Sequence, residues 1–244
     1  MLDLSTADGK IIDAAMRLAA SSGWAGLSFD LIATEAGVSL AEFRRHFPTK
    51  THILAAFTRA ADDAVLTKMP EATAGDTGER DRLFDVLMTR FEVMAPYKAS
   101  LKRIKADLPF RPAEGLALLG GAARTQYWML QAAGVAADGP RGAVSLPGLL
   151  GIYASTFDIW LEDDDPAQSK TMAALDTQLR RGEKLMQQLD RLGKATMQIC
   201  CAFTPKRNVC KKKSGHNDNA STTAKTEEPP AQQANAVNGS APAA

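Results

Sequence analysis

The stretch GVSLAEFRRHFPTK, residues 37–50, places a turn before a very short helix that carries two adjacent arginines. The glycine and serine near its start are typical of a tight turn. The sequence predicts a helix over residues 40–47, because Pro48 disfavours helical geometry at the residue before it. A helix of about two turns is not stable by itself in water, so neighbouring helices must hold it in place.

Helical patterns flank this stretch on both sides. Apolar residues recur at helical spacing over residues 10–22, and Gly23 follows as a stop signal. A second helix begins after Ser28, a good N-terminal cap, and runs to Gly37. A fourth, longer helix begins after Thr49, which we expect to cap it. The second and third helices, joined by a turn, predict a helix-turn-helix in which the third helix reads DNA.

The two faces of the third helix have different expected roles. Leu40, Phe43 and Phe47 fall together on a helical wheel, so we expect this face to pack onto the first two helices. Ala41 and Arg45 point the opposite way. Arg45 is therefore placed to reach a base edge in the major groove, where a guanidinium group pairs with guanine.

The charge of the whole chain conceals a local basic surface. The chain has 29 Lys and Arg residues against 28 Asp and Glu, a formal net charge of +1. Residues 43–59 nevertheless contain four Lys or Arg residues and no acidic one. Arg44 and Lys50 suit phosphates at the edges of the groove, and the free N–H groups beside Thr49 add a further phosphate contact.

Two observations oppose a DNA-reading role. Adjacent arginines on a short helix are more often a solvated face, although the turn and the proline stop around this pair favour DNA. Glu42 lies beside the reading face and repels phosphate, unless it accepts a hydrogen bond from cytosine N4. His46 lies beside it too and suits packing or a phosphate contact.

The run from residue 11 to residue 57 resembles the DNA-binding domain of the tetracycline-repressor (TetR/AcrR) family of transcriptional regulators. Its motifs IATEAGVS and RHFPTK stand in the order and spacing of that domain. The resemblance implies an all-α homodimer whose third helices enter successive major grooves of double-stranded operator DNA. It also implies a C-terminal helical domain for dimerisation and ligand binding.

The same resemblance assigns roles by position. Ser28 and Lys50 match phosphate-contacting positions, whereas Leu40, Ala41, Glu42 and Arg45 match the sequence-reading ones. Arg44 stands where the family usually has a tyrosine that packs against the DNA backbone, and its charge retains the attraction for phosphate. The candidate DNA-binding residues are Ser28, Ser39, Leu40, Ala41, Glu42, Arg44, Arg45, His46, Thr49 and Lys50.

The remainder of the chain also indicates an all-α fold. The turn-rich residues 70–78 separate two domains. Two segments, residues 113–134 and 142–161, are apolar nearly all round and predict buried helices, the second kinked at Pro147. The expected divisions are a helix-turn-helix domain (1–68), a helical ligand-binding and dimerisation domain (79–192), a basic linker (193–213) and a disordered tail (214–244).

Five aromatic residues on the two apolar segments are candidates for a ligand site: Tyr127, Trp128, Tyr153, Phe157 and Trp160. They can line a cavity for a small apolar effector, or they can be ordinary filled core. Residues 126–185 are also similar to ubiquinone-biosynthesis accessory proteins, which bind lipids and share the repressor-family fold. That similarity leaves open a lipid- or quinone-precursor-binding function that makes no use of DNA.

Several other classes of protein find no support in the sequence. It shows no nucleophile with a plausible base, no phosphate-binding glycine loop and no cofactor motif, so we do not expect an enzyme. The three cysteines fit neither a disulfide scaffold nor a standard metal-ligand pattern. With no signal region and no unbroken membrane span, we expect a cytoplasmic protein. The leading hypothesis is a dimeric repressor that responds to a small apolar ligand.

Overall fold

The computed structural model describes residues 2–69 and 78–203, and within these ranges every regular element is a helix. The all-α prediction is confirmed. Two short 3-10 helices, η1 (Ala95–Tyr97) and η2 (Leu108–Phe110), precede and follow α6. The α-helices are α1 (Ala7–Ser22), α2 (Phe29–Ala36), α3 (Leu40–His46), α4 (Lys50–Lys68), α5 (Glu79–Met94), α6 (Lys98–Asp107), α7 (Pro112–Ala132), α8 (Gly139–Glu162) and α9 (Ser169–Phe203).

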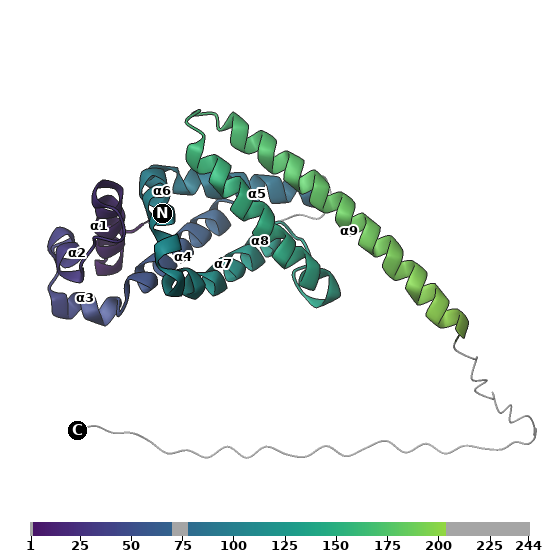
Figure 1. The fold of residues 1–244 in the computed structure, drawn as a ribbon, viewed down its shortest axis with the longest axis horizontal. Coiled ribbons are helices and arrows are strands. Elements are labelled where there is room, and N and C mark those ends of the chain that lie inside the picture. The colour runs from purple at the N-terminus through teal and green to yellow at the C-terminus, as the bar shows by residue number, and fades with distance from the viewer. Residues whose placement is uncertain (1, 70–77, 204–244) are drawn as a thin grey trace, which may run out of the picture. The chain divides into compact units, whose positions relative to one another are not determined.

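Met1–Cys200 form one compact unit, in which α1, α2 and α3 lie together at one end (Figure 1). Across the boundary expected at residues 70–78, α1 packs against α6 and α4 packs against α7. The segments 1–68 and 79–192 therefore share one core. Residues 193–203, assigned from the sequence to a linker, continue α9. Residues 204–213 of that linker and the expected tail lie outside the described residues.

Local signals determine how the N-terminal helices begin. The side chains of Thr6, Ser28 and Ser39 cap α1, α2 and α3, each accepting a hydrogen bond from the backbone N–H three residues ahead. The Thr6 cap starts α1 three residues before the expected position 10. Gly37 follows α2 with a φ of 68°, a left-handed conformation that glycine adopts without steric cost. The turn there leads into α3, so the predicted helix-turn-helix is present.

Aromatic packing holds α3, which has only seven residues. Phe43 and Phe47 are buried, and the Phe43 ring lies 5.3 Å from the ring of Phe29 on α2. Leu40 was expected to pack with them, but it is 51% exposed. The side chains of a helix tilt toward its N-terminus, so the side chain of the first residue extends past the end of α3 instead of into the core.

A buried polar network joins α4, α5, α7 and α8. The Arg90 guanidinium pairs with the Asp62 carboxylate, and both residues are less than 9% exposed. Thr125 Oγ1 donates a hydrogen bond of 2.8 Å to Asp62. Arg90 Nε donates one of 3.1 Å to the Tyr153 hydroxyl. Each polar group therefore finds a partner on another helix, which fixes the relative positions of these four helices.

The expectation that α7 and α8 are buried on all sides is wrong for a single chain. On α7, Leu116 is 72% exposed and Leu119 is 53% exposed, and on α8 Ile159 is 37% exposed. The helix α8 continues through Pro147 and, by length and composition, is apolar enough to cross a membrane, a test that core helices of soluble proteins also pass. The apolar pattern predicts burial, but it does not say what covers the surface.

The residues before α9 include Asp165 and Pro166, two residue types that often begin a helix. Gln168 has a φ of 52°, and this left-handed residue separates Pro166 from the helix, which begins at Ser169. Asp165 still accepts hydrogen bonds from the Ala167 N–H at 3.0 Å and the Ser169 hydroxyl at 2.5 Å. Its carboxylate thus stabilises the turn before α9.

Replacing Arg90 with methionine is expected to lower the free energy of unfolding by about 3–5 kcal/mol, because Asp62 is left buried without its partner. Urea denaturation followed by circular dichroism measures this. The matched variant Arg103→Met, on an exposed position of α6, should change stability by less than about 0.5 kcal/mol. Equal stability of the Arg90→Met variant and the unmodified protein would contradict a stabilising role for the pair.

Candidate nucleic-acid interface

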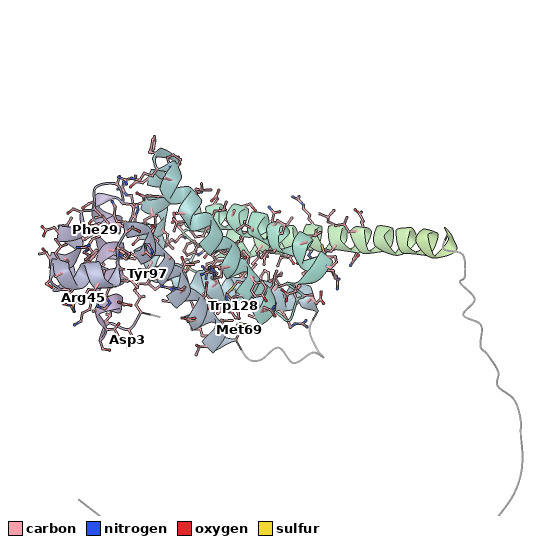
Figure 2. All side chains as sticks on the ribbon, turned by 90° about the horizontal axis from the view of Figure 1, so that it is seen from below. Asp3, Phe29, Arg45, Met69, Tyr97 and Trp128 are labelled. Atoms are coloured by element: carbon pink, nitrogen blue, oxygen red, sulfur yellow. The ribbon has the colours of Figure 1, made fainter. Side chains whose placement is uncertain are left out.

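The exposed face of α3 carries the two arginines that the sequence singled out. Arg44 and Arg45 are both exposed, and within the described residues neither forms an ion pair or a side-chain hydrogen bond. Figure 2 shows Arg45 at the end of the unit that carries α2 and α3. Two unpaired guanidinium groups on neighbouring positions can contact both a base edge and a phosphate.

Ser28 and Ser39 serve first as helix caps. Each hydroxyl oxygen accepts a hydrogen bond of 3.2 Å, from Leu31 N–H and Glu42 N–H respectively. A serine hydroxyl can accept and donate at the same time, so each O–H proton remains free for a phosphate oxygen. The capping role and the expected DNA-contacting role are therefore compatible.

Glu42 and His46, both expected beside the DNA-reading face, each have a structural role within the N-terminal helices. Glu42 is half-buried in the first turn of α3, where a carboxylate complements the helix dipole. His46 Nδ1 lies 2.5 Å from the carboxylate of Asp8 on α1. His46 thus ties the end of α3 to α1, a contact that the sequence analysis did not anticipate.

Thr49 occupies the N-cap position of α4 but makes no capping hydrogen bond. Its hydroxyl instead lies 2.7 Å from both the Thr51 hydroxyl and His52 Nδ1. The capping bond expected from the sequence is therefore absent. Without it, the first N–H groups of α4 keep their affinity for an anion, as the expected phosphate contact requires.

The Lys50 ammonium group makes more contacts inside the protein than phosphate binding requires. Its Nζ donates hydrogen bonds to the Leu27 carbonyl at 2.9 Å and to the Trp24 carbonyl at 3.3 Å. The ammonium group also lies 5.7 Å from the centre of the Trp24 ring. Burial, together with the charge of Arg111, lowers the pKa of Lys50. At most one of its three N–H donors is left for DNA.

The loop between α1 and α2 is bonded from the opposite side as well. The buried Trp24 donates its indole N–H to the Glu114 carboxylate at 3.0 Å. Arg111 bonds to the other oxygen of Glu114 at 2.6 Å and to the Ala25 carbonyl at 3.1 Å. The Ala25 N–H in turn donates to Asp107 at 2.8 Å. Sequence reasoning missed this cluster, because Trp24 and Glu114 are 90 residues apart.

The five aromatic candidates for a ligand site separate into two groups. Tyr153 and Trp160 stack on Phe91 of α5, and Phe157 contacts both Tyr153 and Trp160, with ring centres 5.4 to 5.9 Å apart. These three residues fill part of the core. Tyr127 and Trp128 form a separate edge-to-face pair, and Trp128 is 47% exposed. A cavity of about 650 Å³ lies elsewhere, and none of the five residues lines it.

In the described part of the chain, no three His, Cys, Asp or Glu side chains gather in a way that could hold a metal ion. The cysteine Cys210, and His216 near it, lie outside the described residues.

Comparison with known proteins supports the assignment of the N-terminal helices. Residues 11–57 match the tetR family of bacterial regulatory proteins. This segment runs from the first turns of α1 to the middle of α4, and so includes the helix-turn-helix and every DNA-binding candidate. No curated protein matches the chain.

Solved structures of TetR regulators share the fold over a longer part of the chain. A regulator from Nitrosomonas europaea has a TM-score of 0.57 and 24% identity, covering 71% of this chain and 96% of its own. One from Streptomyces coelicolor has a TM-score of 0.54 and 20% identity, covering 83% and 91%. One from Rhodococcus sp. RHA1 has a TM-score of 0.52 and 20% identity, covering 72% and 98%.

These matches do not support every prediction made from the sequence. The TetR match ends at residue 57, before the segment 126–185 that resembles ubiquinone-biosynthesis accessory proteins. The solved structures named above are all TetR regulators by description. The expected similarity of residues 126–185 to lipid-binding accessory proteins therefore receives no support from them.

Replacing Lys50 with methionine is expected to lower the free energy of unfolding by about 1–3 kcal/mol, because two loop carbonyls lose their charged donor. Urea denaturation of the protein without DNA measures this. Lys68→Met, at the exposed end of the same helix, should cost less than about 0.5 kcal/mol, as should alanine at Arg44 or Arg45. A Lys50→Met variant as stable as Lys68→Met would show that the loop does not depend on Lys50.

Proposed function

We propose that this protein is a sequence-specific DNA-binding transcriptional regulator, a repressor, whose α3 enters the major groove of double-stranded operator DNA. The observation that carries the proposal is a capped helix-turn-helix whose short third helix presents Arg44 and Arg45 exposed and unpaired. The match of residues 11–57 to the tetR family supports it. A DNA-binding regulator of this kind acts in the cytoplasm.

We assign different DNA contacts to the different residues of this interface. Arg45 reads a base edge, whereas Arg44 and the start of α4 beside Thr49 bind phosphates. Lys50 mainly holds the loop before α2 in place, and contributes at most one donor to the DNA. Leu40, exposed at the start of α3 with Ala41, is free to contact a thymine methyl group.

We also propose that the protein acts as a homodimer. The neighbouring helices α7 and α8 expose large apolar residues, among them Leu119 and Ile159. Exposed apolar surface that is contiguous marks an interaction site. A second copy that covers these residues buries this surface and places two α3 helices on successive major grooves.

Control by a small effector completes the proposal. A ligand that prefers one arrangement of the C-terminal helices increases the population of that arrangement. The free energy by which ligand binding changes operator affinity equals the free energy by which operator binding changes ligand affinity. The contacts of α1 with α6 and of α4 with α7 connect these helices to the reading head. Nothing in the described residues favours the lipid-accessory alternative over this function.

Replacing Arg45 with alanine is expected to weaken binding to the preferred operator by about 1–3 kcal/mol and to relax the base preference at one position. Replacing Arg44 with alanine should weaken binding to all DNA sequences by a similar amount. It should also reduce the slope of log K against log salt concentration by about one. Selection of bound sequences from a random library, followed by fluorescence anisotropy titrations, measures both.

Arg181→Ala, on an exposed position of α9, is the matched control for loss of one positive charge and should leave binding unchanged. Unchanged operator binding by both the Arg44 and Arg45 variants would rule out α3 as the reading helix.

Replacing Leu119 and Ile159 with aspartate is expected to convert the dimer to a folded monomer, because charges on a covered apolar face oppose its burial. Light scattering after size-exclusion chromatography measures the mass, and circular dichroism checks the helical content. Leu4→Asp, at a residue that is also about half exposed but lies before α1, should remain dimeric. A dimer that persists with both substitutions would place the contact elsewhere.

A further inference from the structure

The cavity of about 650 Å³ lies among α5, the end of α7, α8 and α9. Its volume falls within the usual range for sites that bind small organic molecules. Side chains from all four helices form apolar walls: Leu83, Leu130, Leu149, Ile152, Leu179 and Met186. A ligand with a substantial apolar body therefore fits these walls.

Glycine 148 of α8 keeps part of this space open. A Cβ atom built at Gly148 meets no other atom within 4 Å, so a larger side chain would extend into free volume. Glycine is less favourable than alanine inside a helix, and at this position packing does not require it. The opposite applies at Gly182 of α9, where a Cβ atom would lie 3.2 Å from Ile152 Cδ1. Close packing there brings α9 against α8 at the wall of the cavity.

The charged residues of the cavity favour a cation. Its lining contains the carboxylates of Glu79, Asp81 and Glu183, and the guanidinium groups of Arg80 and Arg141. Arg80 already bonds to Asp81 at 2.5 Å and lies 3.9 Å from Asp176, and the charge of Glu183 also acts on it. Arg141 has an interaction of its own. An anion would have to displace these partners, whereas a cation finds carboxylates in excess.

We propose that this cavity binds an amphipathic organic cation, with the apolar body against the helix walls and the positive group near Glu79 and Glu183. If the protein is the regulator proposed above, on which this inference rests, such a cation is its effector. The helix α7 offers a direct connection, since Leu130 lines the cavity near one end and Glu114 accepts the Trp24 N–H near the other. Displacement of α7 by a ligand therefore reaches the loop before α2.

Isothermal titration of the full chain with decyltrimethylammonium, decanol and decanoate, each below its micelle concentration, tests the class of ligand. The three probes share one alkyl chain and differ in the charge of the head group. The expected order of affinity is cation, then neutral alcohol, then anion. Tighter binding of decanoate than of decyltrimethylammonium would overturn the assignment to a cation.

Two matched pairs of variants test the location. Gly148→Leu fills the cavity and should weaken binding of the cation by about tenfold or more. Gly151→Leu lies one turn later on the same helix, where a Cβ atom also meets nothing, but it does not line the cavity and should bind normally. Glu183→Gln should weaken binding by about threefold, whereas Glu92→Gln, on an exposed position of α5, should not.

Thermal unfolding establishes whether each variant is folded. If Gly148→Leu does not fold, Glu183→Gln and its control Glu92→Gln still test the site. Equal cation binding by Gly148→Leu and Gly151→Leu, or by Glu183→Gln and Glu92→Gln, would overturn the site. Operator binding measured without any probe separates this failure from that of the proposed function. Specific DNA binding without cation binding would support the proposed regulator but would contradict the cavity as its effector site. Cation binding that does not change operator affinity would contradict the role of the cation as effector.

Discussion

The hydrogen bond from the Trp24 indole to Glu114 fixes the loop on which the position of α3, the proposed reading helix, depends. Trp24 is completely buried, so its N–H needs a partner, and the partner lies on α7 in the other half of the unit. Lys50 bonds to the carbonyls of the same loop from α4. The loop leads directly into α2, which carries Phe29 against Phe43 of α3. The reading helix, too short to be stable alone, thus depends on contacts that begin on α7.

These contacts also explain how positive charge is distributed over the N-terminal helices. A lysine amine that serves backbone carbonyls and an aromatic ring is partly desolvated, and the pKa of Lys50 falls for that reason. The arginines of α3 make no such contacts, and both side chains are exposed. One basic residue therefore stabilises the fold while two others are left for the ligand, although all three looked alike in the sequence.

Local signals in the sequence predicted the caps and turns of the helix-turn-helix, although the capping bond expected from Thr49 is not made. The Ser28 cap, the turn at Gly37 and the stop before Pro48 all act within a few residues, so their structure follows from the residues themselves. The role of Lys50 did not follow, because its carbonyl partners lie 23 and 26 residues away. The cavity was harder still to predict, since its walls come from four helices and none of the aromatic residues first considered lines it. Composition indicates that residues are apolar, but not whether space is left between them.

In the proposed regulator, the exposure of α7 connects dimerisation with the response to a ligand. A helix that is buried on one side by α4 and carries exposed leucines on another can be held by two sets of contacts at once. If a second copy covers those leucines, a shift of α7 changes the position of the Trp24 loop and the spacing of the two α3 helices together. Two reading helices must match successive major grooves about 34–36 Å apart, so a small shift at the dimer contact changes affinity more than the same shift in one isolated head. In the proposed dimer, contact on this face therefore converts a local movement of α7 into a change of operator affinity.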